Sequence, residues 1–143
     1  MIKAKVIIDG VGPTEEAVVK GLKEVVASMR DLGFSIEKEN FGTPERVAED
    51  KCLDFVELLI EFKDFRELFD LILKRDPKSV EILEPEEFSL SKEEVEYCLN
   101  ELISTNRVSA KTLKTLANAT VSLRREVEKL REKIKEESFV ETR

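Results

Sequence analysis

The order in which two hydrophobic periodicities follow one another most constrains how this chain can fold. Alternating apolar residues indicate a strand with one buried face, whereas apolar residues spaced by three and four indicate an amphipathic helix. The spacings give strand, helix, strand, strand, helix and strand over residues 3–9, 14–32, 34–37, 52–62, 64–76 and 80–82. The sequence therefore predicts the order β-α-β-β-α-β.

This order is that of the ferredoxin-like fold, in which two helices cover one face of a four-stranded antiparallel sheet. The first and third strands are central in that topology, and here they are also the two most apolar strands. Agreement between local pattern and global topology favours the assignment. We therefore expect a ferredoxin-like α+β domain over residues 1–86, with Val56, Leu58 and Ile60 in its core.

Residues 87–143 are expected to form a C-terminal helical extension. Ser91 is followed three residues later by Glu94, a capping-box spacing that predicts a helix over about 91–105. Ser109 is expected to cap a second, longer helix over about 109–137. The two helices would form a hairpin or a coiled-coil arm.

The longer helix carries a stripe of residues at three-four spacing that lasts for three heptads. Its members are Leu113, Leu116, Thr120, Leu123, Val127, Leu130 and Ile134. With Leu113 as position a, Glu126 falls at g and Arg131 at e, which weakly favours a parallel pair of helices. The preceding helix could cover only the first half of the stripe, so we expect the chain to self-associate into a homodimer or a higher homo-oligomer.

The sheet face away from the two helices is a second predicted contact surface. Phe55 and Leu59, together with Ile7 and Leu83, would make an apolar stripe on that face. A contiguous apolar surface in a soluble protein usually marks an interaction site. We therefore assign Phe55 and Leu59 to oligomerisation, with the C-terminal helices of the same or another chain as the cover.

Composition disfavours several function classes. The chain has no His, which removes the commonest general base and the commonest transition-metal ligand. Its charge of −7 opposes binding to nucleic acid and to anionic lipid. No apolar run is long enough to span a membrane. We expect a non-catalytic protein without cofactor or metal.

The cellular setting is predicted from the cysteines and the charged surface. Cys52 and Cys98 are isolated within apolar patterns, and we expect no signal peptide because the first residues lack its pattern. They are expected to be reduced core residues of a cytoplasmic protein. The absence of Gln and Trp and the dominance of Glu and Lys are typical of thermophile proteins.

The segment after the first strand is the candidate ligand site. Asp9, Gly10 and Gly12 are expected to form a turn, and Thr14 is expected to cap the following helix. ACT-type regulatory modules, which share the ferredoxin-like topology, hold amino acids at this position; the analogy is one of position, without a shared motif. The sequence thus predicts a regulatory module that binds a small ligand or another protein.

Clustered carboxylates offer an alternative of a different class. Asp9 ends the first strand, while Asp50 and Asp54 flank the start of the third, and divalent cations need several carboxylates at one point. If these side chains meet, the protein would be a metal-dependent enzyme centred on Asp9.

Overall fold

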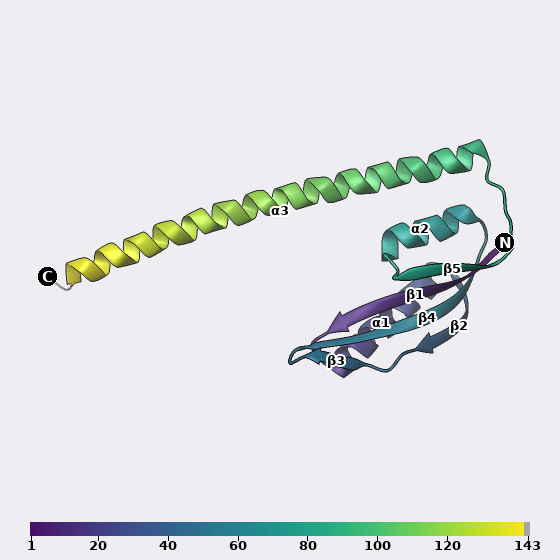
Figure 1. The fold of residues 1–143 in the computed structure, drawn as a ribbon, viewed down its shortest axis with the longest axis horizontal. Helices are drawn as coiled ribbons and strands as arrows, with labels where there is room; N and C mark the ends of the chain where they lie inside the picture. Colours follow the sequence, from purple (N-terminus) through teal and green to yellow (C-terminus); the bar gives the residue numbers. More distant parts are fainter. Residues whose placement is uncertain (142–143) are drawn as a thin grey trace. The chain divides into compact units, whose positions relative to one another are not determined.

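The computed structural model describes the backbone of residues 1–141 and the side chains of residues 1–137. Over that range the chain is an α+β protein with a five-stranded antiparallel sheet and three helices (Figure 1). In chain order the elements are β1 (Ile2–Gly12), α1 (Glu15–Asp31), β2 (Ser35–Phe41), β3 (Glu45–Ala48), β4 (Lys51–Phe62), α2 (Phe65–Arg75), β5 (Ser79–Glu84) and α3 (Lys92–Glu141).

β1 and β4 are the two interior strands and pair along their whole shared length. The antiparallel register runs from Ile2 opposite Phe62 to Gly12 opposite Cys52. β2 pairs with the other edge of β4 and β5 with the other edge of β1, which gives the order β2-β4-β1-β5. The strands with the strongest apolar alternation are therefore the ones buried between neighbours.

β3 corrects the expectation of four strands. It occupies Glu45–Ala48, between the strands expected over 34–37 and 52–62, and it pairs with β4 with Glu45 opposite Leu53. All of its residues are exposed. Because a strand without a buried side needs no apolar alternation, the local sequence pattern does not mark it.

α1 and α2 pack on the same face of the sheet. Leu22 of α1 and Leu68 of α2 belong to one core cluster together with the inward-facing residues of the strands. The predicted core residues Val56, Leu58 and Ile60 are fully buried in this cluster, which confirms them.

Side-chain caps fix the first turn of each helix, and those at Thr14 and Ser91 were predicted from the sequence. Thr14, Asp64 and Ser91 each accept a hydrogen bond from the backbone N–H three residues later, at 3.1, 2.9 and 3.2 Å. These bonds satisfy N–H groups that have no partner within the helix. At the other end of α1, Gly33 adopts a φ of 95°, a conformation that favours glycine.

α3 is one continuous helix, which corrects the prediction of two helices over about 91–105 and 109–137. Ser109, the expected second cap, lies inside it. Residues 105–110 include weak helix formers but neither Gly nor Pro, so continuing the helix costs only a few tenths of a kcal/mol per residue. A break would instead leave backbone groups unsatisfied at two new helix ends. The predicted hairpin is therefore absent from the described residues.

The chain divides into two compact units, residues 1–99 and 100–143, which are treated separately below. The first unit includes the start of α3 because that segment packs on α2. The Tyr97 hydroxyl and the Asp70 carboxylate are 3.2 Å apart in a hydrogen bond, and the Arg66 guanidinium lies 4.1 Å from the centroid of the Tyr97 ring.

The two faces of β4 predict a difference between neighbouring leucines. Leu58→Ala should lower the free energy of unfolding by about 2–5 kcal/mol, because it leaves a cavity in the core. Leu59→Ala removes the same atoms from the half-buried opposite face and should cost clearly less. Urea unfolding of both variants measures the two losses of unfolding free energy. Equal losses would contradict the assignment of Leu58 and Leu59 to opposite faces.

Candidate functional site

A stripe of exposed apolar side chains runs along α3 within the second unit. Six of the predicted oligomerisation residues are between 46% and 67% exposed: Leu113, Leu116, Leu123, Val127, Leu130 and Ile134. Thr120, at the remaining position of the predicted stripe, is exposed as well. The structure thus places all of them on the surface of one helix, where their spacing aligns them along one side.

Because α3 is continuous, the same spacing extends backward from Leu113. Ser109, Asn106 and Leu102 precede it at steps of four, three and four. We call the positions in this three-four pattern from Leu102 to Ile134 the α3 seam. Its first part was not predicted from the sequence, because residues 105–109 were expected to separate two helices; the unbroken three-four spacing was the available signal.

The exposure of the α3 seam is energetically unfavourable in water. Fully burying a Leu, Val or Ile side chain gains about 1.5–3 kcal/mol relative to leaving it exposed. Charged residues dominate the other sides of the helix from Arg124 onward. The amphipathic pattern therefore leaves an apolar stripe exposed on the described part of the second unit.

In the first unit, the start of α3 contacts α2 through residues that do not belong to the three-four pattern. Tyr97 and Cys98 form its inner side, and Cys98 is buried. Val95 and Leu99, on the outer side, are 40% and 54% exposed. The apolar residues at three-four spacing therefore remain exposed here too.

Both cysteines are buried free thiols, as the sequence predicted. Burial raises the pKa of the Cys98 thiol, and the Asp70 and Glu94 carboxylates add to this effect, while the Arg66 guanidinium opposes it. A raised pKa keeps the sulfur protonated at neutral pH, and the thiol is the less nucleophilic form. The site offers no support for Cys98 as a nucleophile.

The open sheet face is more polar than the sequence suggested. Lys5 reaches Glu57 and Glu81 on the neighbouring strands at 3.7 and 3.9 Å, and Lys3 forms a further ion pair, with a carboxylate of β2, at 3.4 Å. Phe55 is 44% exposed and Leu59 is half-buried. Within the first unit, the start of α3 packs on α2 and not on this face.

The candidate ligand segment is an extended strand, which corrects the predicted turn. β1 continues through Gly10 to Gly12, still paired with β4. A Cβ atom on Gly12 would lie 3.0 Å from the backbone nitrogen of Val18, so the missing side chain lets α1 approach the sheet. The Thr14 hydroxyl caps α1, and Asp9 is exposed.

The three acidic residues of the alternative metal site are not brought together. Asp9 pairs with Phe55 on the open face, whereas Asp54 is buried on the face that α1 and α2 cover. Asp50 lies in the turn between β3 and β4. Within the described residues, no group of three or more acidic or cysteine side chains could hold a metal ion.

Asp54 is nevertheless unusual. It is 4% exposed, and its Oδ1 accepts a hydrogen bond from the Phe55 N–H at 2.8 Å. Its Oδ2 is a buried side-chain oxygen without a hydrogen-bond partner among the described residues. A Cβ atom on Gly42 would lie 2.9 Å from Oδ1, so the surroundings are tightly packed. The sequence could have placed it, since it alternates in phase with Cys52 and Val56.

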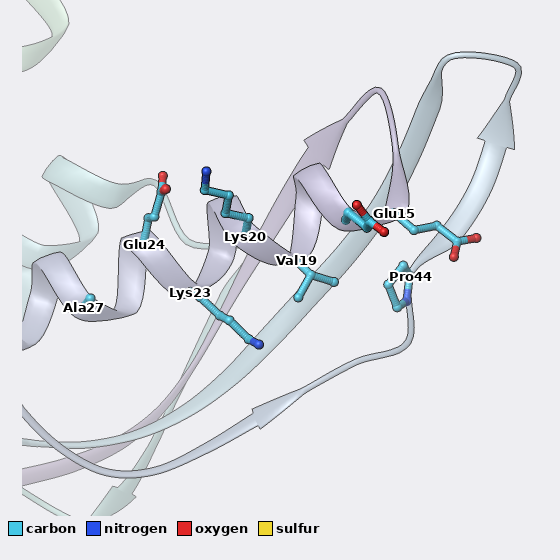
Figure 2. Close-up of a pocket in the computed structure, with 8 residues that line it drawn as sticks. Glu15, Val19, Lys20, Lys23, Glu24, Ala27 and Pro44 are labelled. Atoms are coloured by element: carbon cyan, nitrogen blue, oxygen red, sulfur yellow. The ribbon is translucent and has the colours of Figure 1, made fainter.

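A hollow of about 660 Å³ lies along α1 beside the segment that precedes β3 (Figure 2). Val19, Ala27 and Pro44 supply apolar surface. The charged residues around it carry both signs: Glu15, Glu16, Lys20, Lys23 and Glu24. In Figure 2, Lys20 and Glu24 project from a different side of α1 than Val19 and Lys23. The mixed charges favour no single class of ligand.

Taken together, these features define an α+β protein with an ion-paired open sheet face and an exposed apolar stripe on a long helix. The chain belongs to the MJ0538 family, whose model matches residues 3–143. No curated protein and no solved structure matches the chain. Within residues 1–141, no helix combines the length and apolar character needed to cross a membrane. The family name states no activity, so function rests on the surfaces described above.

The role of Gly12 in helix packing is testable. Gly12→Ala should destabilise the protein by about 1 kcal/mol or more, because the new methyl group meets backbone of α1. Gly21→Ala is the matched control: its Cβ meets nothing within 4 Å and it lies inside α1, so it should stabilise by about 0.5–1 kcal/mol. Thermal unfolding of both variants shows whether each substitution raises or lowers the stability. A stabilising effect of Gly12→Ala would refute the packing role of Gly12.

Proposed function

We propose that this protein is a non-catalytic module that assembles with copies of itself through the α3 seam. The observation that carries the proposal is the exposure of six large apolar residues at coiled-coil spacing on one helix. A scattered set of exposed apolar residues would need no explanation, but a continuous stripe of this kind marks an interaction surface.

We also propose that the sheet and its two packed helices form a ferredoxin-like domain. With β3 set aside, the remaining elements follow the order β-α-β-β-α-β, β1 and β4 are interior, and α1 and α2 pack on one face. These features support the assignment. In this proposal the domain is the part that binds a further protein or a small molecule, and α3 sets how many copies are held together.

Two further properties belong to this proposal. Two buried, unpaired thiols suit a reducing compartment, which supports a cytoplasmic location. The charged composition supports a thermophile source. The metal-dependent alternative has less support, because Asp9 and Asp54 lie on opposite faces of the sheet.

Light scattering after size exclusion tests self-association. At micromolar concentration the wild-type chain should elute with a multiple of its 16.4 kDa mass. The double variant Leu123→Lys with Leu130→Lys should elute with the mass of one chain, because two charges cannot be buried at an apolar contact without a partner.

A second double variant controls for added charge. Asn118→Lys with Ser122→Lys introduces two lysines outside the α3 seam. Its mass should equal that of the wild type. A wild-type mass of a single chain, or an unchanged mass for the Leu123 and Leu130 variant, would refute the proposal.

A further inference from the structure

The α3 seam contains a polar interruption inside a continuous helix. Asn106 occupies an a position and Ser109 the following d position in the pattern that runs through to Ile134. Both are exposed, like the apolar seam residues that follow them. Any partner that covers the whole seam must therefore accommodate a carboxamide among apolar side chains.

The C-terminal part of the seam has the composition of a parallel two-stranded coiled coil. Its last three a positions are β-branched, Thr120, Val127 and Ile134, and the d positions that alternate with them are Leu116, Leu123 and Leu130. β-branched residues at a with Leu at d favour two parallel strands over other assemblies. Thr120 fits this pattern because its hydroxyl already donates to the Leu116 carbonyl at 2.9 Å, which leaves its methyl group for packing.

Asn106 discriminates between the two orientations. In a parallel, in-register pair, each a position meets its own counterpart, so the two Asn106 carboxamides can hydrogen-bond with each other. The antiparallel pairing that buries the same span, Leu102 to Ile134, sets Asn106 against Leu130 and Ser109 against Val127. The amide would then be buried without a partner, which is the costly outcome for a polar group.

Charge adds a smaller contribution in the same direction. Glu126 lies at g, and in a parallel pair it approaches Arg131 at e of the second copy. Because both side chains are exposed, this attraction supports the orientation without dominating it.

We infer that the occupant of the α3 seam is a second copy of this chain, parallel and in register, with Asn106 paired against Asn106 of that copy. This inference rests on the proposed self-association and adds the number of chains, their orientation and the residue that selects them. A single Asn at an a position is known to specify register and oligomer state at a cost in stability.

Disulfide trapping tests the orientation in the full-length chain. Ile134→Cys should form a covalent dimer in a glutathione redox buffer, because the two a positions face each other in a parallel pair. Wild-type chain is the control for Cys52 and Cys98, which are buried and should remain unlinked. Leu102→Cys, at the other end of the seam, should also link to itself.

An equimolar mixture of the Leu102→Cys and Ile134→Cys chains distinguishes the antiparallel outcome. Peptide mass spectrometry should find links between identical positions and almost none between 102 and 134. Predominant 102–134 links, or a scattering mass of three or more chains, would overturn this inference while leaving self-association intact. A wild-type chain that elutes as a monomer would instead overturn the proposed function.

Asn106→Leu tests the selecting residue. In this background the oligomer should resist urea more strongly, while the mixture experiment should yield 102–134 links or higher masses that are absent with Asn106. Asn118→Leu, outside the seam, should change neither result. If Asn106→Leu leaves both orientation and mass unchanged, the role assigned to Asn106 is wrong.

Discussion

The antiparallel pairing of β1 with β4 is the constraint on which the rest of the first unit depends. Eleven consecutive residue pairs join the two strands, from Ile2 with Phe62 to Gly12 with Cys52. This register sends one alternating set of side chains to the helices and the other to the open face. The face on which α1 and α2 pack follows from that division, as do the separate environments of Asp9 and Asp54.

The alternation of apolar and polar residues in β4 explains why much of the fold could be predicted from the sequence. Leu58 and its alternate neighbours are buried because a period of two has a single consistent placement at the centre of a sheet. Gly12 shows where prediction from the sequence pattern fails. A glycine serves a turn or a close approach equally well, and the deciding atom belongs to Val18, on the next element. β3 was missed because exposed strands lack a periodic signal.

Part of the candidate site could also be predicted from periodicity, but the prediction left out the residues that precede Leu113. Spacing alone identified Leu113 to Ile134, since a helix places such residues on one side. Asn106 was taken as part of a helix end because Asn is a weak helix former that favours caps and turns. Only the continuity of α3 shows that this residue keeps the phase of the stripe. A polar residue in phase with apolar ones restricts how a second helix can pair with the stripe. A break in the helix at that residue would impose no such restriction.

Under the proposed pairing, the exposed stripe would also make the conformation of the helix depend on the concentration of the protein. An isolated helix in water is stabilised mainly by what its apolar side packs against, and its formation is cooperative. Under the proposed pairing, that packing is supplied by a second chain, so mass action governs it. Dilution would remove the partner and with it much of the support for the helix beyond residue 99. The helical content of the second unit would then report how much of the protein a cell contains.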